Sequence, residues 1–173
     1  MNKNIVILIL IILILLLGGL FFIKREPADE APRKDPLPTE DEDMSILLYY
    51  YNPDLDEGPG GVKCSRDGLV AVERTIPRTI TPLRASIDLL LKGELTAQEK
   101  ADGLTTEFPL PGFSLETASI VDREAVLSFN DPQNSSSGGS CRAGILRFQI
   151  EATAKQFPTV DSASFLPEEL FQP

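Results

Sequence analysis

The sequence predicts an α/β domain of the two-layer α+β kind. We expect a mixed sheet of about four or five strands with two helices on one face, preceded by a single transmembrane helix. Three observations lead to this class: a long apolar run opens the chain, strand-like and helix-like segments alternate beyond residue 45, and one clear hairpin lies among them. Interleaved strands and helices favour a sheet covered by helices. The expected order is β, β, α, β, β, α, β.

The apolar run extends from Ile5 to Ile23, which is 19 residues without a polar or charged side chain. At about 1.5 Å per residue the run spans roughly 28 Å, close to the hydrocarbon thickness of a bilayer. A signal peptide has a shorter apolar core and a cleavage site of small residues. Bulky or charged residues follow this run instead. A membrane anchor is therefore the leading interpretation, and a cleaved signal is the alternative.

The charges that flank the run predict its orientation only weakly. Lys3 precedes it, and Lys24 and Arg25 follow it, so the positive-inside rule gives nearly a tie. The tail at residues 1–4 is very short, and two cysteines in the rest of the chain suit an oxidising exterior. We therefore expect a single-pass protein of the cell membrane, with a cytoplasmic tail and the C-terminal domain on the extracytoplasmic side.

Two further regions follow the predicted anchor. Residues 24–45 carry four prolines, eight acidic and four basic residues, and almost nothing apolar. Such a segment cannot bury enough surface to fold, so it is predicted to be a disordered, semi-extended stalk. Residues 46–173 form one domain of 128 residues, a usual size for a single core.

Composition argues against several classes of function for this domain. It has 11 basic and 18 acidic residues, a net charge of −7, which argues against nucleic acid as a partner. The chain has no histidine, which removes Ser-His-Asp, Cys-His and His-metal chemistry. We therefore predict no enzyme and no cofactor, metal or catalytic residue. The alternative is a hydrolase with paired carboxylates, whose candidates stand out only by being acidic: Glu73, Glu107 and Glu116.

Periodicity and turn residues predict the individual elements. Thr96 and Glu99 form a capping box for a short helical turn, and Pro158 stops the last helix. Helical spacing places Cys141, Ile145, Phe148 and Ala152 on one apolar face of that last helix. The expected elements are strands at 46–51 and 69–76, a helix at 82–92, a hairpin of strands 115–121 and 125–129, a helix at 141–156 and a strand at 160–165.

Two kinds of side chain are candidates for a role outside the core. A disulfide between Cys64 and Cys141 is predicted, because two unpaired thiols would be a liability on an exported domain. The alternative is that Cys141 is a small buried hydrophobe. The tyrosines at 49–51 could supply a stacking face for sugars, although tyrosines in a strand are more often half-buried.

Three stretches of the chain together resemble the GerMN domain family. They are VAVERTIPRT with TPLRASIDLLLKGEL, then TTEFPLPGFSLETASIVDREAVLSF, then GGSCRAGILRFQIEATAKQFPTVDSASF, and the resemblance covers residues 46–166. It implies a small α/β module with two helices packed on a sheet. Family members are membrane-tethered, extracytoplasmic interaction or assembly modules without known active-site residues. This chain has one copy of the domain, whereas the spore germination protein has two, which argues against carrying over a sporulation role.

The resulting functional hypothesis is a non-catalytic, membrane-anchored, extracytoplasmic interaction or assembly module. Its expected partner is a protein or a second copy of the chain, and not a nucleic acid. The alternative is a domain that binds or senses a cell-envelope polymer or a small ligand.

Overall fold

The computed structural model describes residues 42–173, which form a mixed α+β fold with two sheets and three α-helices. The predicted anchor at 5–23, and the predicted stalk as far as residue 41, lie outside the described residues. Within residues 42–173, no helix is both long and apolar enough to cross a membrane. The elements are β1 (Asp43–Tyr51), β2 (Leu69–Pro77), α2 (Pro82–Leu90), α3 (Ala97–Ala101), β3 (Ser114–Val121), β4 (Glu124–Asn130), α4 (Ser140–Ala154) and β5 (Ser162–Leu166), with short 3-10 turns at Pro59–Gly61 and Arg66–Gly68.

The first sheet is the antiparallel pair of β1 and β2, which stays in register from Asp43 opposite Pro77 to Tyr51 opposite Leu69. Alternate side chains of β1 point to the core, so Ile46, Leu48 and Tyr50 are buried. The strand begins at Asp43, before the predicted start at residue 46. The end of the predicted stalk is therefore part of the sheet.

The second sheet has the order β3-β4-β5, with β3 antiparallel and β5 parallel to β4. The predicted hairpin turns at Asp122 and Arg123, whose positive φ angles of 49° and 66° suit a two-residue turn that follows the strand twist. Leu127 of β4 is buried, as the pattern predicts. Ile120 lies opposite the buried Ala125, on the predicted face, but it remains 42% exposed because it sits at the end of an edge strand.

The prediction of one mixed sheet is wrong, because the free edge of β1 is occupied by the side chains of Thr153 in α4 and of Gln156, two residues beyond its end. The Leu47 N–H donates to Gln156 Oε1 at 2.7 Å, and Gln156 Nε2 donates back to the Leu47 carbonyl at 2.7 Å. The Tyr49 N–H donates to Thr153 Oγ1 at 3.1 Å. The side-chain amide thus takes the place of a neighbouring strand. Because this edge is already satisfied, the other three strands form a sheet of their own.

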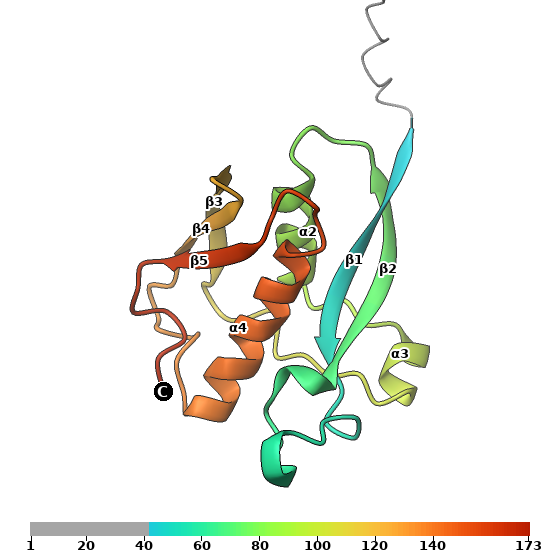
Figure 1. The fold of residues 1–173 in the computed structure, drawn as a ribbon, viewed down its shortest axis with the longest axis vertical. Helices are drawn as coiled ribbons and strands as arrows, with labels where there is room; N and C mark the ends of the chain where they lie inside the picture. Colours follow the sequence, from blue (N-terminus) through green and yellow to red (C-terminus); the bar gives the residue numbers. More distant parts are fainter. Residues whose placement is uncertain (1–41) are drawn as a thin grey trace, which may run out of the picture. The chain divides into compact units, whose positions relative to one another are not determined.

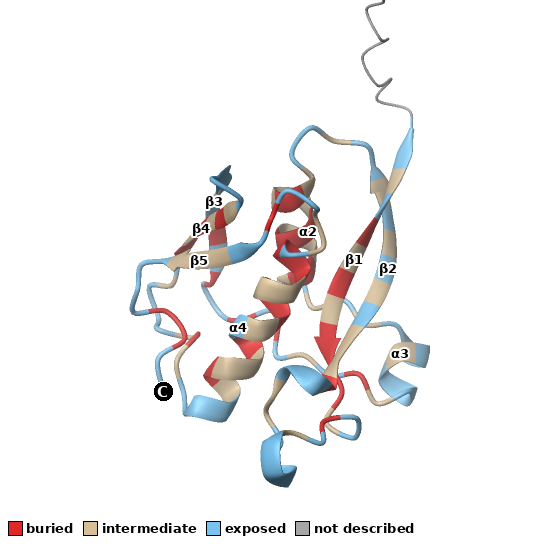
Figure 2. Ribbon diagram, in the orientation of Figure 1, coloured by how far each residue is buried: buried red, intermediate tan, exposed pale blue. Residues whose placement is uncertain are grey.

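Helices α2 and α4 lie between the two sheets and contact both (Figure 1). The prediction of both helices on one face of a single sheet is therefore wrong as well. Helix α2 packs on β1 and β3, and α4 packs on β1 and β5. The predicted apolar stripe of α2 is buried at Leu83, Ile87 and Leu90. Figure 2 shows the buried residues concentrated where the helices meet β1 and β4.

The predicted buried face of α4 is on the wrong side of the helix. The buried residues are Ala143, Leu146, Gln149, Ile150, Thr153 and Ala154, which lie nearly opposite the predicted stripe. Small residues on this face allow close packing on β1 and α2. The stripe of Cys141, Ile145, Phe148 and Ala152 remains partly or fully exposed. Helical spacing is compatible with either face being buried. The prediction favoured the face with the larger apolar side chains, Ile145 and Phe148, whereas the structure buries the other face.

The C-terminal tail returns to the core. Leu170 and Phe171 are each only 8% exposed. The Phe171 ring meets Phe113, Phe129 and Phe165 edge-on, with centroid distances of 5.9, 6.4 and 5.4 Å. The tail therefore belongs to the domain and closes its second sheet at one end.

Candidate functional site

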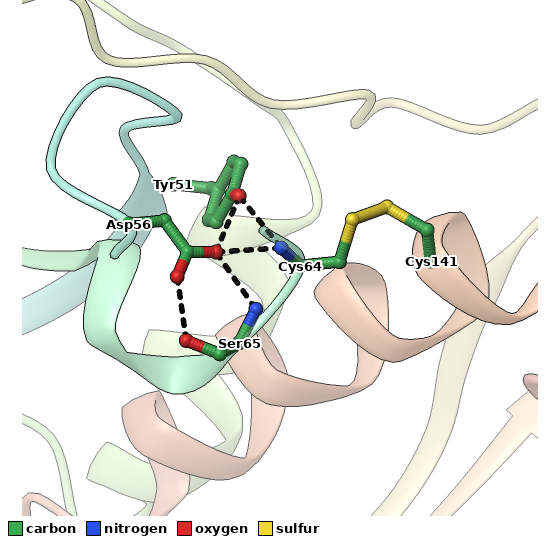
Figure 3. The surroundings of a disulfide bond; sticks show 5 residues. All are labelled: Tyr51, Asp56, Cys64, Ser65 and Cys141. Carbon is green, nitrogen blue, oxygen red and sulfur yellow. Dashed lines mark hydrogen bonds between the residues drawn. A yellow bond between two sulfur atoms is a disulfide. The ribbon is translucent and has the colours of Figure 1, made fainter. Parts of the chain in front are cut away.

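The loop at residues 52–68 joins β1 to β2 and is fixed to α4 by a disulfide. Cys64 in the loop and Cys141 in the first turn of the helix are bonded, with their Cα atoms 5.2 Å apart and a sequence separation of 77 (Figure 3). In the chain-entropy account, closing so long a segment stabilises the fold by about 4 kcal/mol. The loop and the helix therefore form one covalently joined surface.

The carboxylate of Asp56 organises the loop beside this disulfide. Its Oδ2 accepts hydrogen bonds from the Tyr51 hydroxyl at 2.6 Å and from the N–H groups of Cys64 and Ser65 at 2.6 and 2.7 Å. Its Oδ1 accepts from Ser65 Oγ at 2.6 Å (Figure 3). These donors, the Ser65 hydroxyl above all, hold the pKa of Asp56 well below its usual range. Burial and the bond to Asp56 raise the pKa of Tyr51, so that residue stays a donor.

The start of the loop is tied to the rest of the domain by an asparagine. Asn52 Oδ1 accepts the Asp54 N–H at 2.9 Å, and its Nδ2 donates to the Asp102 carbonyl at 3.0 Å, just after α3. The alternating Asn52, Asp54 and Asp56 therefore build turns. No cluster of three side chains suited to hold a metal ion occurs in the described part of the chain.

The loop also covers part of the predicted stripe on α4. The guanidinium of Arg66 lies 4.0 Å from the centroid of the Phe148 ring, and its Nη2 is 2.6 Å from Glu151 Oε2. Next to it Val62 is 69% exposed. This face is thus a rigid, mixed surface of apolar and charged side chains.

The three acidic candidates for a hydrolase are engaged in separate places. Glu73 accepts from the Ser45 hydroxyl, Glu107 pairs with Arg142, and Glu116 accepts from Ser128. The three carboxylates therefore bond to different partners in different parts of the domain.

The three tyrosines do not share an accessible face. Tyr50 is fully buried and Tyr51 is 6% exposed, so neither is available for stacking on a sugar. Burial raises the pKa of Tyr50, whose hydroxyl has no hydrogen-bond partner in the described residues. Tyr49 is half-buried and lies beside Arg66 and Lys155.

Sequence reasoning named the two cysteines but not the residues that position them. Asp56 receives donors from β1 and from residues eight and nine positions later, a spacing that no motif marks. Its one sequence signal is the density of turn residues around it.

The sequence model of the Germane family, described as sporulation and spore germination, matches residues 47–169. The chain belongs to the Germane family. Among solved structures, this Germane domain is similar to the first GerMN domain of the sporulation protein GerM from Bacillus subtilis, with 14% identity over 70% of this chain and 80% of that one and a TM-score of 0.49. The tandem GerMN domains of the same protein match at 21% identity over 77% of this chain and 42% of that one, with a TM-score of 0.47. No curated protein matches the chain.

The family match agrees with the resemblance that the sequence motifs suggested. It associates the Germane domain of this chain with sporulation and spore germination. The family is not known for catalysis.

Proposed function

We propose that this chain is a non-catalytic interaction module, anchored in the cell membrane by residues 5–23 and displayed on the extracytoplasmic side. The observation that carries the proposal is the disulfide between Cys64 and Cys141, which fixes a long exposed loop on a helix of a Germane domain. Such bonds persist in oxidising compartments and are rare in the cytosol. A loop held in this way presents its surface with little ordering cost on binding.

The acidic composition of the domain and the hydrogen-bonded charged side chains of the loop support binding of a protein rather than catalysis. Two charged groups of the loop are used in the fold: Asp56 in its four hydrogen bonds and Arg66 in its contacts with α4. The domain is acidic and lacks histidine. The expected partner is another envelope protein or a second copy of the chain. For the alternative, a binder of envelope polymers, only Tyr49 of the three tyrosines is accessible.

The test is crosslinking of the full chain in intact cells, followed by identification of the crosslinked proteins. Protease added outside the cells should remove residues 46–173 while leaving a membrane-bound fragment. A matched variant with two leucines of the 5–23 run replaced by arginine should lose the membrane fraction, because a charge at the centre of a span is costly.

Two outcomes would contradict the proposal. Protection of the domain from external protease would overturn the orientation. Recovery of the monomer alone, with no crosslinked protein, would overturn the interaction role. Retention on isolated cell wall, lost on Tyr49→Ala, would favour the polymer binder instead.

A further inference from the structure

The four outer strand edges of the two sheets are treated differently. The free edge of β1 is occupied by Gln156 and Thr153 of α4. The free edge of β2 is covered by its own Arg74, whose guanidinium donates to the Glu73 carbonyl at 3.1 Å and to the Glu94 carbonyl at 3.2 Å. The same guanidinium donates two hydrogen bonds of 2.7 Å to the carboxylate of Glu99 in α3. The edge of β1 is therefore covered, whereas the edge of β2 is covered only at the Glu73 carbonyl.

In the second sheet, β3 is also protected where it begins. Arg84 of α2 donates to the carbonyls of Leu115 and Glu116, at 3.3 and 2.8 Å. A bulge between Leu115 and Thr117 breaks the regular edge. Bulges and edge charges of this kind are ways to prevent pairing with another strand.

The outer edge of β5 has no such cover among residues 42–173. Instead Ala163, Ser164 and Phe165 line a groove of about 460 Å³, whose other walls include Arg147 of α4 and the tail from Glu168 onward. Alternate residues of a strand point their N–H and C=O groups to opposite edges, and those of β5 that face away from β4 have no hydrogen-bond partner among residues 42–173. Its five residues give roughly 16 Å of edge.

Arg147 is exceptional among the arginines of residues 42–173. The other six each form an ion pair with a carboxylate: Arg66, Arg74, Arg78, Arg84, Arg123 and Arg142. Arg147 has no ion pair and lies 5.4 Å from the centroid of the Phe165 ring. In a domain with more acidic than basic residues, this arginine without an ion pair lies in the groove beside the uncovered edge of β5.

We propose that this groove binds an extended, acidic segment of a partner protein, which adds to β5 as a further strand and places a carboxylate on Arg147. The inference deepens the proposed function and rests on it. Backbone hydrogen bonds along β5 would supply register, and the planar guanidinium suits a bidentate carboxylate. Phe165 offers an apolar contact for the neighbouring side chain. Glu168 also lines the groove, and its negative charge would repel a second acidic side chain of the peptide. We therefore expect only one acidic position in the bound segment.

The test is selection from a phage-displayed library of random nine-residue peptides on the immobilised full chain in detergent. The wild type should enrich Asp or Glu at one position. Arg147→Glu should reverse that preference to Lys or Arg, and Arg147→Ala should weaken a selected peptide about tenfold, a usual effect of losing one charged contact. Lys100→Glu is the control, because it makes the same reversal of charge at an exposed residue of α3 outside the groove. It should leave the selection unchanged.

A second readout places the peptide. Amide hydrogen exchange of residues 163–165 should slow when a selected peptide binds, and the exchange of residues 117–121 in β3 should not change. Absence of an acidic preference, or the same peptides from wild type and Arg147→Glu, would overturn the inference. If crosslinking still recovers a partner that Arg147→Glu does not affect, the interaction role stands and only the groove is wrong. If no partner is recovered by crosslinking, the proposed function fails as well.

Discussion

The two sheets of this domain handle their edges in opposite ways. In the first sheet, Gln156 and Thr153 satisfy β1, and Arg74 covers the Glu73 carbonyl of β2. In the second sheet, β5 keeps an uncovered edge in a groove with an unpaired arginine. Exposed strand edges are templates for unwanted pairing, and proteins usually block them. The β5 edge differs from the others in lying beside a groove with an unpaired arginine, which indicates a place where pairing has a use.

The two regions are therefore expected to have different roles, the first sheet in stability and the β5 groove in binding. The first sheet is built to stay closed, and the disulfide and Asp56 hold its connecting loop on α4. Mutations there should cost stability. Mutations at the β5 groove should cost binding and leave stability almost unchanged. Four predictions test that contrast.

The largest effect is expected from the disulfide that holds the first sheet on α4. Replacing both Cys64 and Cys141 by alanine should lower the free energy of unfolding by about 4 kcal/mol, because the unfolded chain regains the freedom of a long closed segment. Urea denaturation of the oxidised wild type and the double variant measures the difference. Reducing agent should destabilise the wild type similarly and leave the variant unchanged. Equal midpoints for the two proteins would show that the bond contributes nothing.

The next effect concerns the side-chain cover of β1. Gln156→Ala should cost about 2 kcal/mol, because the Leu47 N–H and carbonyl both lose their partner. Hydrogen exchange at Leu47 should accelerate more than exchange elsewhere in β1. Gln172→Ala is the control, since that amide bonds only to an exposed carbonyl of the tail. A loss below about 0.5 kcal/mol, the usual size of the effect of a surface substitution, would mean that Gln156 does not protect this edge.

A smaller effect is expected at the cover of β2, and it depends on pH. Bonds from Arg74 hold the pKa of Glu99 at about 2, below its usual 4.5. A lowered folded-state pKa stabilises the fold at pH values above 4.5, and this contribution disappears as the pH falls from 4.5 towards 2. Glu99→Gln should therefore cost about 1 kcal/mol at pH 7. Thermal unfolding at pH 7, 4 and 2 should show the gap from wild type shrinking. A constant gap would assign the effect to lost helix capping alone.

The smallest effect is expected at the groove. Arg147→Ala should change the free energy of unfolding by less than about 0.5 kcal/mol, because the side chain has no ion pair and is exposed. Arg66→Ala should be more destabilising, since it leaves Glu151 and the Phe148 ring without their partner. Chemical denaturation of the two variants in parallel gives the comparison. A large loss for Arg147→Ala would make that residue structural and weaken the case for a binding role.

Local signals in the sequence predicted much of this fold. The capping box of Thr96 and Glu99 is present, with both of its hydrogen bonds. The hairpin around Asp122 and the stripe of α2 also follow from turn residues and periodicity. In each case the cause lies within a few residues of the chain, where propensity and spacing act directly.

The remaining features depend on contacts between distant segments. The division into two sheets follows from Gln156 taking the place of a strand beside Leu47, a contact across 109 residues. The buried face of α4 depends on how closely β1 and α2 approach, which favours Ala143 over Phe148. Neither the division into two sheets nor the buried face of α4 can be recognised from the spacing of apolar residues. The groove was missed for the same reason, since an unpaired arginine is recognised only when the partners of the others are known.

The order of the chain gives the disulfide a further consequence. If the domain is exported as proposed, starting from the anchor, Cys64 reaches the oxidising side before Cys141, because 77 residues separate them. Arg147, β5 and the tail all follow Cys141, so every wall of the groove emerges after the second cysteine. Under the proposed topology, the groove would be completed only after both cysteines have emerged. A chain stalled before this point would lack the walls that the proposed partner needs, so the order of emergence would delay assembly.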